Sequence, residues 1–210
     1  MMSKQSIGFN FSEDYILEDD VIKLMPLRIE HIKQLVKISD DPDIWLYFFE
    51  KGNDLESLTT YVESAIQNRN YEKEYPLIVF DKRKNSYAGT TRFYEFSSVF
   101  NSIKLGHTWL GKNYRGTGLN KHCKYLLFQF AFEKMEFERI GFGAYAGNVI
   151  SIAAMESVGC KKEGVLREFF PSLDNKGRTD AILFSILKKE WDAEVKSQLK
   201  NKLNNSKNNY

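Results

Sequence analysis

The sequence has little cysteine, and neither sign of charge is in clear excess. Its two cysteines, Cys123 and Cys160, are too few for a disulfide framework and form no C-x-x-C pair. Each falls in an apolar pattern, so both are expected to be buried free thiols. The 30 lysines and arginines against 28 aspartates and glutamates give a formal charge of +2. This balance argues against a dedicated nucleic-acid-binding protein, in which basic residues concentrate on one face.

Long apolar segments and clusters of metal ligands are also missing. The residues after Lys4 contain no continuous apolar stretch of the kind found in signal peptides. No segment reaches the roughly 18 uninterrupted apolar residues of a membrane span. The 3 histidines have no partners at metal-ligand spacing, so no metal is expected, and His107 is interpreted as a core or edge histidine. We therefore expect a soluble cytoplasmic protein, monomeric or homodimeric, with no membrane or nucleic-acid partner.

The sequence does contain enough apolar material for one core, with 42% hydrophobic residues, among them 14% aromatic residues. A length of 210 residues favours one domain rather than two, and we assign residues 1–192 to it. Residues 193–210 form a polar tail, rich in Asn and Lys from Lys196 on. We expect this tail to be disordered, because it has too little apolar surface to offset the entropy of ordering.

The spacing of apolar residues predicts the secondary structure. Strands are expected at 21–25, 76–80, 87–96, 102–110, 139–145, 161–170 and 179–188. Helices are expected at 29–38, 55–68, 119–135 and 149–158, the last with Asn148 as its N-cap and Gly159 as its stop. This order predicts an α/β protein of the α+β type, with a mixed, mostly antiparallel seven-stranded sheet and helices on both faces.

The most informative segment is a glycine-containing turn between a strand and a helix. The strand ends at Leu110, Gly116 and Gly118 follow, and the helix begins at once. Glycines allow positive φ and close approach of a ligand, and the first N–H groups of a helix have no internal partners. Lys112, Arg115 and Lys121 add positive charge. The turn therefore predicts an anion site suited to a pyrophosphate, although by itself it also fits a connection that only caps a helix.

The same turn resembles the signature of the GNAT acetyltransferase superfamily, Gln/Arg-x-x-Gly-x-Gly/Ala, at the start of that family's central helix. Here it reads Arg115-Gly116-Thr117-Gly118-Leu119-Asn120, and Asn120 departs from the Gly or Ala of the family. Residues 147–153, 159–167 and 177–180 resemble the RimJ/RimL-like branch, which modifies protein N-terminal amines and some small molecules. The resemblance extends from about Val21 to Trp191.

This resemblance implies the GNAT acyl-CoA N-acyltransferase fold, with acetyl-CoA as co-substrate and a V-shaped opening between the splayed central strands 102–110 and 139–145. The turn from Arg115 to Asn120, including Gly116, Thr117, Gly118 and Leu119, would bind the pyrophosphate. The pantetheine would pair with the backbone near Thr108, Trp109 and Leu110, where an N–H would polarise the thioester carbonyl. Asn148 would bind the pantetheine arm, and Ser151 would lie beside the sulfur.

The catalytic groups are less clearly indicated. Ser151 lies one turn after Asn148 on the same helix face and is the candidate proton donor to the coenzyme A thiolate. The alternative is a small solvent-exposed serine at a helix start. The branch resemblance implies a glutamate base at a position that Phe170 occupies here. A second family position for a base is occupied by Lys104.

Other groups of the chain could act as the base instead. Glu95 lies near the expected acceptor entrance, although a solvated strand-end charge is the simpler interpretation. Glu168, Asp180 or water are further alternatives. Tyr145, at the mouth of the parting strands, is a candidate acid or a core residue. The aromatic group Trp45, Tyr47, Phe48 and Phe49 would either shape an apolar acceptor pocket or belong to the core.

The sequence thus predicts an acetyl-CoA-dependent N-acetyltransferase that acts on a primary amine, either a protein N-terminus or a small molecule. Direct transfer within a ternary complex is expected, because neither cysteine is placed to carry an acetyl group. The alternative is an acyl-CoA-binding module with little or no catalysis. The absence of the glutamate at Phe170 and the presence of Lys104 at the second base position favour this alternative.

Overall fold

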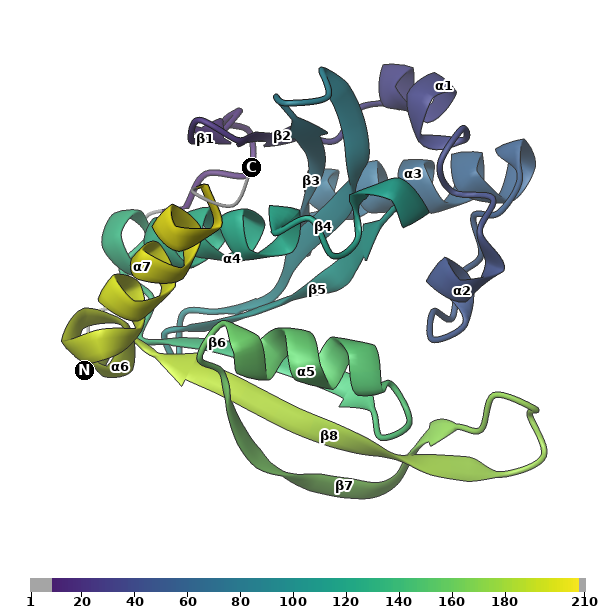
Figure 1. The fold of residues 1–210 in the computed structure, drawn as a ribbon. Coiled ribbons are helices and arrows are strands. Elements are labelled where there is room, and N and C mark those ends of the chain that lie inside the picture. Colours follow the sequence, from purple (N-terminus) through teal and green to yellow (C-terminus); the bar gives the residue numbers. More distant parts are fainter. Residues whose placement is uncertain (1–8, 208–210) are drawn as a thin grey trace.

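The computed structural model describes residues 9–207, which form one eight-stranded sheet in the order β1-β2-β3-β4-β5-β6-β8-β7 (Figure 1). The strands are β1 (Leu17–Glu18), β2 (Ile22–Pro26), β3 (Glu74–Asp81), β4 (Ser86–Ser97), β5 (Ser102–Leu110), β6 (Arg139–Tyr145), β7 (Lys161–Pro171) and β8 (Arg178–Leu187). The helices are η1 (Ile29–His31), α1 (Ile32–Leu35), α2 (Pro42–Trp45), α3 (Leu55–Asn70), η2 (Lys112–Tyr114), α4 (Leu119–Gln129), η3 (Phe130–Lys134), α5 (Val149–Ser157), α6 (Lys188–Glu190), η4 (Trp191–Val195) and α7 (Lys196–Lys207).

The predicted mixed, mostly antiparallel sheet is confirmed, since only β5 and β6 pair in parallel. The number of strands differs from the expected seven. The additional strand is β1, which consists of two residues that pair as Leu17↔Leu24 and Glu18↔Lys23. A segment this short shows no alternation that sequence reasoning can detect.

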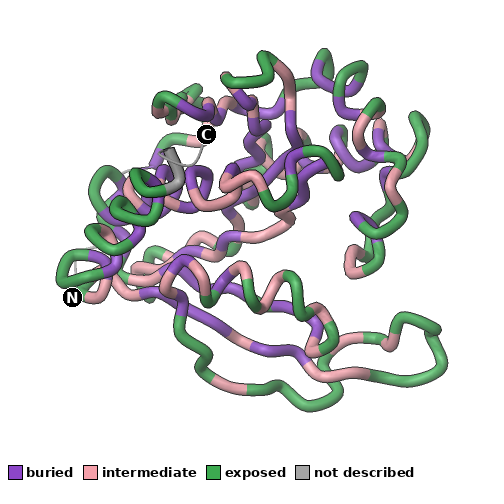
Figure 2. The backbone as a smooth tube through the Cα atoms, in the orientation of Figure 1, coloured by how far each residue is buried: buried purple, intermediate pink, exposed green. Residues whose placement is uncertain are grey.

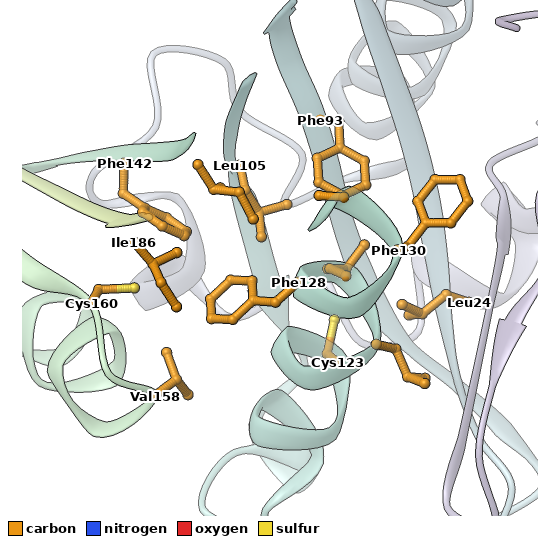
Figure 3. Packing of buried hydrophobic residues seen from close by; sticks show 14 of the residues in the cluster. Leu24, Phe93, Leu105, Cys123, Phe128, Phe130, Phe142, Val158, Cys160 and Ile186 are labelled. Atoms are coloured by element: carbon orange, nitrogen blue, oxygen red, sulfur yellow. The ribbon is translucent and has the colours of Figure 1, made fainter. Parts of the chain in front are cut away.

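The two faces of the sheet carry separate apolar clusters. On one face, Leu105 of β5 and Phe142 of β6 pack in the same cluster as Cys123 and Leu127 of α4. Figure 3 shows Cys123 and Phe128 of α4, and Phe130 of the following η3, among side chains of the sheet such as Leu105 and Ile186. On the other face, a cluster that includes Ile78 of β3 and Trp109 of β5 packs against α3. Helices therefore cover both faces, as the element order predicts.

An aromatic segment before the first predicted strand completes the main core. The Phe9 ring is 4.9 Å from the Phe96 ring and 5.0 Å from the Tyr75 ring, measured between centroids. The hydroxyl of Tyr75 donates a 2.7 Å hydrogen bond to the carbonyl of Glu13. The sequence pattern before residue 21 gave no periodic signal for this contact, because the segment follows no regular helix or strand.

The expectation of a disordered tail is wrong for residues 193–207. The last described helix, α7, packs on α4 (Figures 1 and 2). Leu199 and Leu203 are 1% and 6% exposed, although the helix is otherwise polar. These two leucines are four residues apart and therefore lie on one helix face. Two apolar side chains on one stripe supply enough burial to order a helix that composition alone describes as polar.

The parallel strands β5 and β6 separate soon after they meet. They pair only at Ser102↔Arg139, Ile103↔Ile140 and Lys104↔Gly141, and each then continues along its other neighbour. A β-bulge in β5 follows the last pair, because one residue of β4 lies opposite two residues, His107 and Thr108. Bulges bend the strand that carries them, so β5 turns away from β6. The splayed central pair is confirmed, and the opening between its arms is called the fork below.

Candidate active site

The glycine turn at the start of α4 has the geometry of an open anion site. Gly116 and Gly118 have φ of +72° and +80°, a left-handed conformation that favours glycine. Among residues 9–207, no acceptor is hydrogen-bonded to the N–H groups of Gly116, Thr117 and Gly118. A Cβ built on either glycine would meet nothing within 4 Å. Free N–H groups at the positive end of a helix and open space above them suit a phosphate.

The side chain of Arg115 is engaged within the protein. Its Nε donates to the carbonyl of Leu110 at 2.9 Å, and its guanidinium pairs with Asp41 at 3.0 Å. Asp41 also caps α2, since its carboxylate accepts from the N–H of Asp43. Arg115 therefore links the end of β5 to the segment before α2. The groups of the turn that are best placed to contact a phosphate are its free backbone N–H groups.

Two basic side chains beside the turn escaped the sequence reasoning. Arg83 donates to the carbonyl of Thr117 at 3.3 Å, and Lys84 donates to the carbonyl of Asn113 at 2.7 Å. Both belong to the turn between β3 and β4, about thirty residues earlier in the chain. Only the antiparallel pairing of the sheet brings that turn beside the start of α4. Sequence spacing carries no sign of this proximity.

Asn120, which departs from the family pattern, lies in the first turn of α4. Its Oδ1 is buried and has no hydrogen-bond partner within the described part of the chain. A buried acceptor without a partner costs about 1–3 kcal/mol. A bound ligand that donates a hydrogen bond to this oxygen would remove that cost, so the residue fits a binding turn.

Asn148 and Ser151 lie together at the start of α5. The Asn148 Oδ1 accepts from the N–H of Ser151 at 3.0 Å, which confirms Asn148 as the N-cap. The Ser151 side chain is half-buried, and within the described range its hydroxyl has no hydrogen-bond partner. A hydroxyl without a protein partner can donate to a ligand. This geometry is compatible with the proton-donor role, which stays a prediction.

An aromatic wall lies at the far end of β6. It consists of Tyr47, Phe49, Tyr145 and Phe170. The Tyr145 and Phe170 rings stack at 4.4 Å between centroids, with an angle of 20° between planes. Phe49 contacts Phe170 at 5.8 Å, and the Tyr47 hydroxyl donates to the carbonyl of Gly147 at 2.9 Å. Where the branch resemblance implied a carboxylate base, the protein therefore has stacked apolar surface.

The aromatic group after the first helix divides between core and wall. Trp45 is 2% exposed and belongs to the apolar cluster against α3, and Phe48 packs against the same cluster. Phe49, by contrast, is 69% exposed and reaches Phe170. Trp45 and Phe48 therefore belong to the core, whereas Phe49 lies at the surface, and its part in an acceptor pocket stays a prediction.

The structure does not bring Glu95 to the aromatic wall. Its carboxylate pairs with the Lys104 ammonium at 2.6 Å, and Lys104 is the last β5 residue paired with β6. Tyr145 lies four residues beyond the Gly141 partner of Lys104, which is roughly 13 Å along the strand at 3.3 Å per residue. Glu168 and Asp180 lie nearer the wall, on the β7–β8 pair. The carboxylate of Asp180 accepts from the N–H of Glu168 at 2.8 Å, and its carbonyl accepts from the N–H of Ala146, next to Tyr145, at 2.9 Å.

His107 is the titratable side chain on the bulge itself. Its φ of +48° is unusual for a residue other than glycine, and its ring lies 5.3 Å from Tyr94 and 6.2 Å from Phe48. Burial, together with the nearby Arg92 guanidinium, lowers the pKa of His107 to about 4. The imidazole is therefore neutral at pH 7 and a weak base. The sequence pattern missed its position, because a bulge leaves no signature in apolar alternation.

A fork between parallel strands, with free N–H groups at the adjoining helix start, has a shape and polarity suited to an elongated, phosphate-bearing ligand. A family model described as "Acetyltransferase (GNAT) domain" matches residues 22–161. The chain belongs to this GNAT acetyltransferase family. The family uses acetyl-CoA, and the free N–H groups of the turn and the unpaired Asn120 oxygen fit that molecule.

Two related sequences extend the likeness over most of the chain. "Putative ribosomal N-acetyltransferase YdaF" of Bacillus subtilis (strain 168) is 28% identical over 177 residues, which cover 83% of this chain and 90% of that protein. "Uncharacterized N-acetyltransferase p20" of Bacillus licheniformis is 24% identical over 176 residues, covering 81% and 94%.

Solved structures show the same fold. A GCN5-related N-acetyltransferase from Brucella melitensis superposes with a TM-score of 0.81 at 22% identity, over 90% of this chain and 85% of that one. Ribosomal-protein-S5-alanine acetyltransferase from Vibrio fischeri superposes with a TM-score of 0.69 at 16% identity, over 85% and 99%. In the described part of this chain, no helix is long and apolar enough to cross a membrane. The same residues contain no group of three or more potential metal ligands.

Proposed function

We propose that this acetyltransferase transfers the acetyl group of acetyl-CoA directly to a primary amine within a ternary complex. The observation that carries the proposal is the fork, which opens beside the free N–H groups of Gly116, Thr117 and Gly118. Beyond Lys104, the β5 backbone on the side of β6 has no strand partner in the described structure. It can therefore pair with the amides of the pantetheine and polarise the thioester carbonyl with an N–H.

Direct transfer is supported by the state of both thiols. Cys123 and Cys160 are 1% and 5% exposed. Burial raises the pKa of Cys123 to about 11 and that of Cys160 to about 12. A nucleophilic cysteine needs an accessible thiolate, and neither residue provides one. A covalent acetyl-cysteine step is therefore not part of the proposal.

The preferred acceptor is an α-amine, as at a protein N-terminus. An α-amine has a pKa of about 8 and a lysine side chain one of about 10.4, so the α-amine needs much less help to lose its proton. Three positions of this site that could hold a general base offer a weak one or none. Phe170 replaces a carboxylate, Glu95 is paired with Lys104, and His107 is a weak base. The word "ribosomal" in the name of the Bacillus subtilis relative agrees with a protein acceptor.

Two measurements test the proposal. Calorimetry should detect acetyl-CoA binding to the purified chain at micromolar ligand. Release of coenzyme A thiol should then depend on a peptide with a free N-terminus. The matched control is the same peptide with a blocked N-terminus and one internal lysine. Equal thiol release from both peptides would contradict the α-amine preference, and no binding at all would contradict the whole assignment.

A second function, acyl-CoA binding with little or no catalysis, is favoured by one observation. The Tyr145–Phe170 stack fills the position where the branch resemblance implies a base. The same experiment separates the two functions. Binding of acetyl-CoA without thiol release, across peptides, polyamines and amino sugars, would support the binding module.

A further inference from the structure

Lys124 places an amine between the two arms of the fork. It lies in the second turn of α4 and is 6% exposed. Its Nζ donates to the Thr108 Oγ1 at 3.1 Å and lies 5.8 Å from the centre of the Phe142 ring. Thr108 belongs to β5 and Phe142 to β6, and both follow the last pair of the two strands, Lys104↔Gly141. The amine therefore lies between β5 and β6, on the face of the sheet that α4 covers.

This amine has no anionic partner in the described chain. The Thr108 hydroxyl is already shared with the Thr91 hydroxyl at 2.8 Å. The titratable groups that face Lys124 are the thiols of Cys123, on α4, and Cys160, before β7. Burial raises the pKa of both thiols, so they are neutral at pH 7. The neighbourhood of Lys124 therefore supplies one hydroxyl and no negative charge.

A buried ammonium without a counter-ion is costly for the fold. Burial lowers the pKa of Lys124, because the apolar surroundings disfavour its charged form. A methionine or leucine would fill the same volume without this cost. A buried amine that is costly to the fold and lies at a ligand-binding opening is a candidate for a functional role with a bound ligand.

We propose that Lys124 pairs with the thiolate of coenzyme A that forms in the fork during acetyl transfer. The proposal rests on the proposed function. The acceptor nitrogen bonds to the carbonyl carbon and gives up a proton to water, while the carbon–sulfur bond breaks and its electron pair stays on sulfur. The Lys124 ammonium lies opposite this negative sulfur and stabilises it. The Lys124 amine and the sulfur share one proton between them in this pair. When coenzyme A is released, a second proton from water leaves Lys124 as the ammonium and the sulfur as the thiol.

The test measures the sulfur rather than the turnover. Ultraviolet absorbance of the thiolate gives the pKa of the thiol in bound coenzyme A, and free coenzyme A in the same buffer is the reference. In the unmodified protein we expect this pKa to be at least one unit below the reference. In Lys124→Met it should return to the reference value. The affinity for coenzyme A relative to desulfo-coenzyme A, above the thiol pKa, should then fall about tenfold, which is the equivalent of one pKa unit.

Lys121→Met is the matched control. Lys121 lies one turn earlier on α4 and is half-buried, and its ammonium has no hydrogen-bond or ion-pair partner among the described residues. Removing its charge beside the phosphate turn should weaken coenzyme A, acetyl-CoA and desulfo-coenzyme A by the same factor. The pKa of the bound thiol should stay at the value of the unmodified protein.

Three results would contradict the proposals. A bound thiol that titrates as in free coenzyme A, in the unmodified protein, would overturn the proposal even if Lys124→Met failed to fold. So would a mass increase of one acetyl group on Lys124 after incubation with acetyl-CoA, since the amine would then be a nucleophile. Failure of the unmodified protein to bind either coenzyme form would instead refute the proposed function.

Discussion

Replacing Gly118 by alanine separates strain in the turn from its contact with the coenzyme. Gly118 has φ of +80° and is the N-cap of α4, and its added Cβ would meet nothing within 4 Å. No clash is therefore expected in the free protein. The methyl group would instead stand in the space above the free N–H groups, where the pyrophosphate is expected.

The cost to stability can be worked out from the backbone. A left-handed conformation costs an alanine about 1–2 kcal/mol. The smaller entropy of the unfolded chain returns roughly 0.4–1 kcal/mol. The net loss is on the order of 1 kcal/mol, which lowers Tm by roughly 2–4 °C in a protein of this size. Affinity for coenzyme A should fall by more, at least about tenfold or 1.4 kcal/mol, because the phosphate can no longer approach the N–H groups.

Gly164→Ala provides the control for the same change in side chain. Gly164 lies in β7, has ordinary φ, and its added Cβ also meets nothing within 4 Å. Its Tm and coenzyme affinity should stay close to those of the unmodified protein. Thermal unfolding and calorimetry measure both quantities. If Gly118→Ala bound coenzyme A as tightly as Gly164→Ala, the turn would not be the phosphate site.

Three further outcomes are expected. Ser151→Ala should lower kcat more than acetyl-CoA affinity, and an unchanged kcat would remove Ser151 from the reaction. Leu199→Ala should lower the free energy of unfolding by about 2–5 kcal/mol, because it leaves a cavity beneath α7, and should lower Tm by roughly 5–15 °C. Asn204 is exposed on the same helix, so Asn204→Ala should change Tm little. Burial of Asp19 disfavours its ionised form, but hydrogen bonds from His122 and two backbone N–H groups outweigh this and lower the pKa of Asp19 below 3.8. The stability that this carboxylate contributes is present above pH 3.8 and is lost as the pH falls through the lower folded pKa. Below about pH 4, the free energy of unfolding, measured with urea, should therefore fall less in Asp19→Asn than in the unmodified protein.

The sequence by itself determined most of the long helices and strands and the glycine turn before α4. Apolar residues at helical spacing define α4, and the glycines that precede it take the positive φ that the turn requires. These signals are local, because a helix stripe and a left-handed backbone each depend on residues only a few positions apart. The same locality explains the errors. Two leucines four residues apart order α7, and a composition rich in Asn and Lys conceals them.

Only the tertiary structure decided which side chains meet. It pairs Glu95 with Lys104, stacks Phe170 on Tyr145, and ties Arg115 to Asp41. It also places Lys124, which the helix pattern treats as one more polar position, under the fork, where none of residues 9–207 supplies a counter-ion. Each of these contacts joins different elements of the chain, and the bulge in β5 likewise depends on its register with β4. No spacing within one segment encodes it, because the partners of each strand come from distant parts of the chain.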